Sequence, residues 1–226
     1  MPRGAAAGGG VARVSRQLVL WRHGRTRWNA AGRAQGQTDI GLDDLGRAQA
    51  AAAAPILASL GPTAIVSSDL SRAADTADVL AKLTGLVVTR DPALREIHFG
   101  EREGLTLAES YERFPDEMKR WWAGEDVRIP GGETRSETAE RFSAALTGYV
   151  ETMGVNDTVI VVSHGGAMRV GACRFLGLPR ETWPVLGGFD NCHWAWLSEG
   201  RRGWRIEAWN VGGLPPELEA GDRAPG

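Results

Sequence analysis

Short apolar runs alternate along the chain with longer segments of helical character. The runs predict buried strands at Gln17–Trp21, Ala64–Ser67, Leu86–Thr89 and Val159–Val162. Strands that are apolar on both faces are typical of a parallel sheet covered by helices on both sides. We therefore expect an α/β fold consisting of a single three-layer domain, with a mainly parallel central sheet and helices on both faces.

The expected helix ends are marked by capping residues, glycines and prolines. Asp43 caps an alanine-rich helix that is kinked near Pro55 and ends at Gly61-Pro62. A second helix covers Leu70–Leu83, and Gly85 ends it. Further helices are expected over residues 106–123 with a break at Pro115, after a cap at Ser136, and from the glycines that follow Val162 to about Leu176.

The domain that these elements form spans residues 17–211. Near its end, Trp194, Trp196, Trp204 and Trp209 alternate in two strands around the turn S-E-G-R-R-G, which predicts a hairpin. Residues 1–16 and 212–226 are rich in Gly, Pro and Ala. We expect a disordered N-terminal extension and a flexible C-terminal tail there.

Composition limits the classes of function. The net charge of the 226 residues is -2 and the basic residues are dispersed, so nucleic acid is not an expected partner. No apolar stretch is long enough for a membrane span, and residues 1–16 lack the apolar core of a secretory signal. The cytoplasm is the expected location. Cys173 and Cys192 form neither a disulfide framework nor a zinc pattern, so we expect two reduced, buried thiols and no metal site. A single disulfide bond between them is the alternative that the sequence leaves open.

Arginine and histidine residues follow three of the predicted strands. Arg22 and His23 end the first strand, Arg72 lies in the first turn of the helix after the second, and His164 precedes the helix after the fourth. The carboxyl ends of parallel strands meet at one edge of a sheet. A helix N-terminus attracts anions, and two guanidiniums add planar, bidentate donors. This combination predicts a phosphate site.

The motifs L-W-R-H-G-R-T-R-W-N, S-S-D-L-S-R-A-A-D-T-A, L-R-E-I-H-F-G-E-R-E-G and V-V-S-H-G-G occur in this order. Together they resemble those of the histidine phosphatase (phosphoglycerate-mutase-like) superfamily, over most of residues 17–210. The resemblance implies an enzyme without a cofactor, in which His23 is the nucleophile. Arg22, Arg72 and His164 would hold the phosphoryl oxygens, and Glu96 would be the acid and base. As an acid near neutral pH, Glu96 would need partial burial to retain its proton.

Other polar residues near the first strand are weaker candidates for contacts with the substrate. Asn29 matches the family pattern R-H-G-x-T-x-x-N, and Gln35 lies on the same loop. Thr26 and the backbone N–H of Gly165 are further candidates, although Thr26 is equally suited to capping a turn. His98 and His193, the other two of the four histidines, fall on no position that defines a family motif and are expected to have no part in the site.

The segment of residues 106–135 contains Trp121-Trp122, which either roofs the site or anchors the segment to the core. The residues after Glu96, F-G-E-R-E-G-L-T, resemble the short phosphatase branch of the family rather than its mutases. The C-terminal part and the loop Q-G-Q-T-D resemble members that act on glucosyl-3-phosphoglycerate. A broad-specificity sugar or organic-acid phosphatase, a cofactor-dependent phosphoglycerate mutase and a non-catalytic phosphate-binding protein stay open as alternatives. The family also implies a homodimer.

Overall fold

The computed structural model describes residues 15–213 and residue 218, and it contains one six-stranded sheet with the order β3-β2-β4-β1-β5-β6. The strands are β1 Gln17–Arg22, β2 Ala64–Ser67, β3 Val88–Arg90, β4 Thr158–Ser163, β5 Trp194–Gly200 and β6 Gly203–Val211. β1 to β4 run parallel, whereas β5 pairs antiparallel with β1 and β6. The mainly parallel sheet and the late hairpin are confirmed, and the third strand lies one to two residues later than expected.

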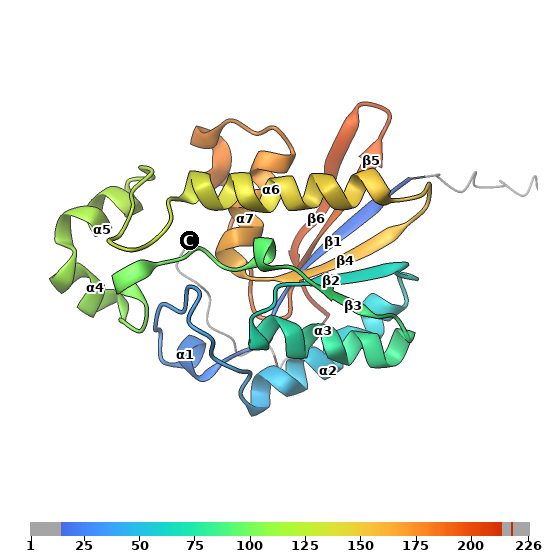
Figure 1. Ribbon diagram of the computed structural model, residues 1–226, viewed down its shortest axis with the longest axis horizontal. Helices are drawn as coiled ribbons and strands as arrows, with labels where there is room; N and C mark the ends of the chain where they lie inside the picture. The colour runs from blue at the N-terminus through green and yellow to red at the C-terminus, as the bar shows by residue number, and fades with distance from the viewer. Residues whose placement is uncertain (1–14, 214–217, 219–226) are drawn as a thin grey trace, which may run out of the picture.

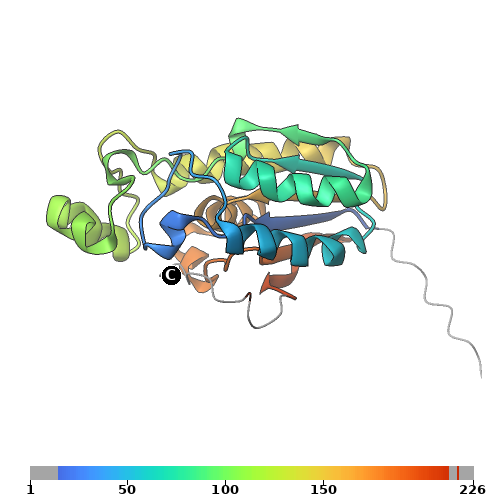
Figure 2. The same cartoon turned by 90° about the horizontal axis from the view of Figure 1, so that it is seen from below.

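Helices cover both faces of the sheet, as Figures 1 and 2 show. On one face, α6 (Arg135–Thr152) and α7 (Gly165–Phe175) contribute side chains such as Phe142 and Met168 to a core with β1 and β4. On the other face, α2 (Asp44–Ala58) and α3 (Ser71–Thr84) bury alanines and leucines against the same strands. The small alanine side chains bring α2 close to its neighbours. The three-layer α/β architecture is therefore confirmed.

Local sequence signals explain most helix ends. Asp43 caps α2 by accepting from the N–H of Gly46, and Pro55 lies inside this helix, which ends at Ala58, before the expected Gly61-Pro62. Gly85 ends α3 in the left-handed region at φ 73°, where glycine carries no Cβ penalty.

The expected cap of the long helix α6 was wrong. Thr134, and not Ser136, is its N-cap, and Thr134 and Glu137 bond reciprocally as a capping box. Threonine and serine are both preferred at an N-cap. Only Thr134 is followed three positions later by a glutamate, Glu137, which completes the capping box.

Two short helices, α4 (Leu107–Arg113) and α5 (Pro115–Trp122), lie beyond the carboxyl ends of the parallel strands in Figure 1. The break at Pro115 is where the sequence indicated it. The small helix α1 (Arg27–Ala30) follows β1 at the same end, and the 3₁₀ segments Pro92–Leu94, Gly100–Arg102 and Arg180–Val185 complete the connections. This end of the sheet thus carries most of the irregular chain.

The expectations for the two ends of the chain lie largely outside the described residues. Arg16 belongs to the expected N-terminal extension but lies within the described residues. It pairs with Glu199 on β5 at 2.7 Å and also donates to the carbonyl of Val150. Within the described part of the chain, no helix has both the length and the apolar character needed to cross a membrane.

Candidate active site

A cavity of about 220 Å³ opens at the carboxyl ends of the parallel strands. Six of the nine residues predicted for the site line its wall: Arg22, His23, Gln35, Arg72, Glu96 and Gly165. The other three, Thr26, Asn29 and His164, are buried behind the wall. A cavity of this size suits a small metabolite rather than a macromolecule.

His23 directly follows β1 and is 2% exposed. Its Nδ1 lies 2.7 Å from the carbonyl oxygen of Gly24, which can only accept, so Nδ1 carries the proton and Nε2 holds the free lone pair. Burial, followed by the positive charges of Arg72 and Arg22, lowers the pKa of His23 well below its usual value. The ring is therefore neutral near pH 7, and one nitrogen is ready to act as a nucleophile.

Arg72, in the first turn of α3, is fully buried and held from three sides. Its Nη1 donates to the carbonyl of Thr38 at 3.0 Å, its Nη2 to that of Gly36 at 2.7 Å, and its Nε to Nδ1 of His164 at 3.1 Å. Burial lowers the pKa of Arg72 to about 10, so the side chain stays charged. These contacts fix the plane of the guanidinium beside His23.

Both ring nitrogens of His164 are engaged. Because Nδ1 accepts from Arg72, Nε2 carries the proton and donates to Oγ of Ser68 at 2.9 Å. The ring stacks edge-on against His23, with centroids 5.1 Å apart. Burial and the charge of Arg72 lower the pKa of His164 well below its usual value. His164 therefore holds Arg72 in place, and its own neutral ring lies beside His23.

Arg22 is the last residue of β1 and is 5% exposed. One of its terminal nitrogens donates to the carbonyl of Phe189, in the loop before β5. A Cβ on Gly165 would lie 3.5 Å from Arg22 Cδ, so the guanidinium lies beside the first residue of α7. Arg22 and Arg72 thus provide two charges on the wall that His23 shares.

The carboxylate of Glu96 lies on the N-terminus of α7. Its two oxygens accept from the backbone N–H groups of Gly166 at 3.1 Å and Ala167 at 2.7 Å, and from its own neighbour Ile97 at 2.9 Å. These three donors fix the position of the carboxylate at the start of the helix. A Cβ on Gly166 would lie 2.8 Å from Glu96 Oε1, so glycine is what permits this approach.

Glu96 lies on the cavity wall, and its role as the acid and base stays a prediction. Two of its three backbone donors could not be anticipated from the sequence, because they come from α7, some seventy positions away.

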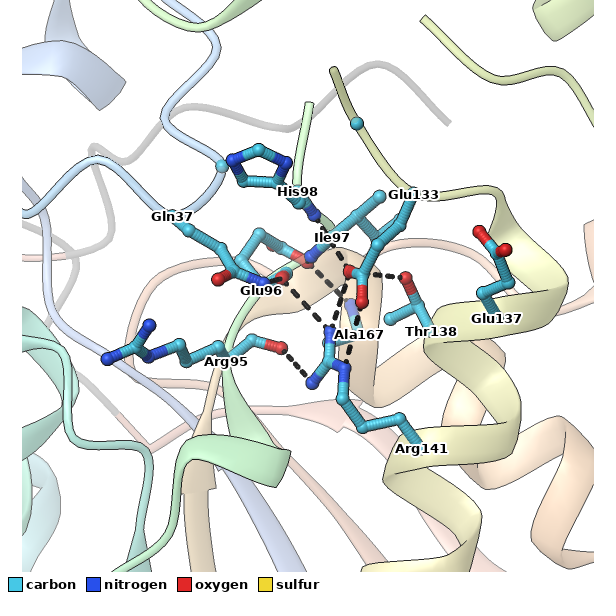
Figure 3. A network of polar contacts seen from close by, with 12 residues as sticks. Gln37, Arg95, Glu96, Ile97, His98, Glu133, Glu137, Thr138, Arg141 and Ala167 are labelled. Atoms are coloured by element: carbon cyan, nitrogen blue, oxygen red, sulfur yellow. Dashed lines mark hydrogen bonds and ion pairs between the residues drawn. The ribbon is translucent and has the colours of Figure 1, made fainter. Parts of the chain in front are cut away.

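A network around Arg141 of α6 holds the loop that carries Glu96 (Figure 3). Arg141 donates to the carbonyls of Ala93 at 2.7 Å, Arg95 at 3.0 Å and Glu96 at 3.3 Å. Its charge is balanced by Glu133, whose carboxylate oxygens lie 2.9 and 3.1 Å from it. Sequence reasoning missed Arg141, and no motif marked it. The network fixes the direction in which Glu96 points.

Thr26 and Asn29 build the small helix that shapes one side of the cavity. Thr26 caps α1 by accepting from the N–H of Asn29, and Oδ1 of Asn29 accepts from the N–H of Thr26 in return. Thr26 also donates to Oε1 of Gln35 at 2.8 Å, which leaves the amide N–H₂ of Gln35 as the donor that this side chain can offer at the cavity wall. The capping role of Thr26, one of its two sequence interpretations, is present.

His98 and His193 do not line the cavity. His98 lies 3.7 Å from Glu103, and Nδ1 of His193 lies 3.2 Å from the carbonyl of Asn210. Cys173 and Cys192 are buried and free, and burial raises the pKa of both thiols. In the range that the structure covers, no group of three or more His, Cys, Asp or Glu is placed to hold a metal ion.

Trp121 and Trp122, at the end of α5, serve both of the roles that the sequence left open. They pack with Phe99, Ile97 and Val127 in a small apolar cluster. Both also line the cavity, so the segment that anchors α5 to the core at the same time covers the site.

A family model described as "Histidine phosphatase superfamily (branch 1)" matches residues 18–212. The chain belongs to the histidine phosphatase superfamily. The match covers all six strands apart from the first residue of β1, and it includes each residue placed on the cavity wall.

Individual histidine phosphatases match most of this chain. The glucosyl-3-phosphoglycerate phosphatases of Mycolicibacterium vanbaalenii and Mycobacterium tuberculosis are each 40% identical to it, over 87% of this chain and 95% of their own length. A probable phosphoglycerate mutase of Erwinia tasmaniensis is 35% identical over 86% of this chain and 90% of its own.

A solved structure of mycobacterial glucosyl-3-phosphoglycerate phosphatase with VO3 superposes with a TM-score of 0.82 at 41% identity. It covers 87% of this chain and 100% of the other.

Proposed function

We propose that this histidine phosphatase is a metal-independent phosphomonoesterase that forms a phosphohistidine on His23, with glucosyl-3-phosphoglycerate as its substrate. One observation carries the proposal: a neutral His23, with Nδ1 fixed by Gly24, shares one cavity wall with Arg22, Arg72 and Glu96. A nucleophile, a cationic clamp and a carboxylate are thus brought together, as phosphoryl transfer requires.

In the first step, Nε2 of His23 attacks phosphorus, the new N–P bond forms, and the ester P–O bond breaks. The equatorial oxygens carry most of the charge in such a transition state. Arg22 and Arg72 neutralise it from fixed positions, which is the role that a metal ion has in other phosphatases. We propose that His164 adds a donor by exchanging Ser68 for a phosphoryl oxygen when substrate binds.

Glu96 handles the protons of both steps. The departing ester oxygen takes a proton from Glu96; in the second step Glu96 takes one from water, whose oxygen attacks phosphorus as the N–P bond breaks. The three backbone donors hold the carboxylate in one position on the cavity wall through both steps.

Trapping of the intermediate tests the mechanism. Rapidly quenched enzyme should carry one phosphoryl group on the peptide that contains His23, and His23→Ala should lose both this adduct and turnover while its circular dichroism spectrum is unchanged. Turnover by a folded His23→Ala variant would contradict the assignment. A folded wild-type protein that releases phosphate from no ester would instead support a phosphate-binding protein.

Two relatives, each 40% identical to this chain, are named glucosyl-3-phosphoglycerate phosphatase, and the cavity has a size that suits a small metabolite. We propose the substrate on these two grounds. Phosphate release measured over glycosylated phosphoglycerates, phosphoglycerates, sugar phosphates and p-nitrophenyl phosphate tests it. A dedicated enzyme should show the highest kcat/KM with glucosyl-3-phosphoglycerate. Similar values over the panel would instead identify a broad-specificity phosphatase.

The 35% identity to a probable phosphoglycerate mutase gives a second candidate. A mutase would interconvert 2- and 3-phosphoglycerate without release of phosphate, so the same samples, analysed by NMR, separate the two activities. The phosphatase assignment is favoured because a phosphatase needs only to admit water, whereas a mutase has to retain and turn a bisphosphate.

Two further properties belong to this proposal. A cytoplasmic location fits the two free, buried thiols, which are typical of proteins in reducing compartments. A homodimer is proposed on the family resemblance alone, and light scattering after size-exclusion chromatography decides it.

A further inference from the structure

Four arginines line the cavity besides the pair that flanks His23, and one of them, Arg33, is paired with Glu109 at 3.1 Å. The other three are Arg102, Arg135 and Arg169. They come from three separate parts of the chain, a 3₁₀ turn, the start of α6 and the second turn of α7. Arg135 and Arg169 lie outside the quoted motifs, Arg102 lies within one of them without an assigned role, and the proposed catalytic steps use none of the three. Only the folded chain brings these three side chains together on one wall of the cavity.

These three guanidiniums have no carboxylate partner within ion-pair distance among the residues that the structure describes. Other arginines near the site are paired, Arg141 with Glu133 and Arg180 with Asp126. A charge that is removed from water without a partner is costly. An unpaired cluster of like charge beside a cavity therefore indicates an anionic ligand.

Aromatic faces hold two of the three. Arg135 lies 3.9 Å from the centroid of the Trp121 ring and donates to the Trp121 carbonyl at 2.9 Å. Arg102 lies 5.0 Å from the centroid of Phe99 and 5.9 Å from that of Trp121. The buried Nε atoms of both arginines have no hydrogen-bond partner in the described part of the molecule. The rings orient the guanidiniums and leave these donors unsatisfied.

The positive charges also repel each other. Burial, followed by the charges of Arg169 and Arg180, lowers the pKa of Arg135 to about 10, and burial lowers the pKa values of Arg102 and Arg169 as well. An anion between the guanidiniums would relieve both the desolvation and the repulsion.

Helix α7 sets the distance between this cluster and the phosphate end. Arg169 is four residues after Gly165, which lies beside Arg22, so the two positions share a helix face. Four residues of α-helix rise about 6 Å, and side chains lean towards the helix N-terminus. The backbone of Arg169 is therefore about one helical turn from the phosphate end of the cavity, which suits a second anionic group on the same small molecule.

We propose that Arg102, Arg135 and Arg169 form a second anion subsite, which binds the carboxylate of a phosphorylated organic acid while Arg22 and Arg72 hold its phosphate group. The proposal rests on the proposed function, and it adds the residues that select a phosphorylated acid over a neutral phosphate ester. The planar guanidinium fork matches a carboxylate in bidentate geometry.

The test compares two esters that differ in the second anion, 3-phosphoglycerate and glycerol 3-phosphate. Arg169→Gln and Arg102→Gln should each lower kcat/KM for 3-phosphoglycerate by about 10- to 100-fold, the range expected for loss of a charge-assisted hydrogen bond. The values for glycerol 3-phosphate should stay within about twofold, because its phosphate contacts are unchanged. Arg174→Gln is the matched control, since Arg174 is on the same helix, is half-exposed and pairs with Glu140 outside the cavity.

The ratio of the two kcat/KM values decides the outcome. An unchanged ratio in both variants, with circular dichroism showing a native fold, would overturn the subsite, as would an equal loss on both esters. Recovery of the ratio in Arg169→Lys would support a role of the charge. A preference for fructose 1,6-bisphosphate over 3-phosphoglycerate that Arg169→Gln removes would assign the cluster to a second phosphate and overturn the carboxylate.

Binding separates failure of the subsite from failure of the proposed function. Should the wild-type protein release phosphate from no ester of the panel, the proposed function fails, and titration calorimetry with 3-phosphoglycerate and glycerol 3-phosphate still tests the cluster. Arg169→Gln should then weaken the binding of 3-phosphoglycerate and leave that of glycerol 3-phosphate unchanged. Equal binding of 3-phosphoglycerate to wild type and variant would refute the subsite.

Discussion

Replacement of Arg72 by lysine is a sharp test of the site, because the change keeps the charge and removes only the planar fork. Arg72 donates in three directions, to the carbonyls of Gly36 and Thr38 and to Nδ1 of His164, at 2.7 to 3.1 Å. A lysine ammonium is a compact charge on a flexible stem and cannot reach all three partners. At least two acceptors in this buried region would therefore lose their donor.

The expected loss of stability follows from that count. A buried acceptor without a partner costs about 1–3 kcal/mol. With two acceptors affected and the ammonium partly compensating, Arg72→Lys should lower the free energy of unfolding by about 2–4 kcal/mol, measured by urea unfolding. The kinetic loss comes in addition, because a point charge does not reproduce bidentate contact with a phosphoryl group. We expect kcat/KM for p-nitrophenyl phosphate to fall by about 10- to 100-fold.

The control is Arg174→Lys, in which a half-exposed arginine on α7 changes in the same way. This variant should keep the stability of the wild type within about 0.5 kcal/mol and its kcat/KM within about twofold. Wild-type kcat/KM in a folded Arg72→Lys protein would refute the reasoning that geometry, and not charge alone, makes this residue part of the phosphate clamp.

Three other outcomes follow from the site. The free energy of unfolding should fall as pH drops below about 6.5, by up to about 1.4 kcal/mol per pH unit for His164, because the pKa of His164 is lowered in the folded protein and the unfolded chain takes up the proton first. In urea unfolding, His164→Gln should show a smaller change in this free energy per pH unit than the wild type, and equal changes would contradict the reasoning. Arg141→Gln should reduce kcat about tenfold for glycerol 3-phosphate and less for p-nitrophenyl phosphate, whose leaving group needs little help from an acid, because Glu96 loses its support; equal losses would assign Arg141 a merely structural role. Gly166→Ala should lower kcat because its Cβ would press on Glu96 Oε1 at 2.8 Å, and an unchanged kcat would show that the carboxylate has room to move.

The sequence was sufficient for those parts of the fold and site that depend on short-range patterns. Apolar runs located the strands, and because parallel strands end at one edge, the position of Arg22, His23 and Arg72 at strand ends was enough to bring them together. The motif glycines and the left-handed Gly85 were equally local signals.

The parts that could not be predicted depend on contacts between distant segments. Glu96 meets the N–H groups of α7, and Arg141 meets the loop of Glu96 from another helix. Neither contact has a sequence signature, because an arginine on a helix is usually a solvated surface residue. The same reason hid the cluster of Arg102, Arg135 and Arg169, which becomes a cluster only after folding.

The loop that carries the nucleophile is tied to a segment near the end of the chain. The carbonyl of His23 accepts from Nδ2 of Asn191 at 3.0 Å and from the N–H of Cys192 at 3.3 Å, and β1 lies between β4 and β5. The nucleophile therefore depends on groups about 170 positions further along the chain. A chain truncated before residue 191 lacks these ties, and the backbone of His23 should then lose its fixed position.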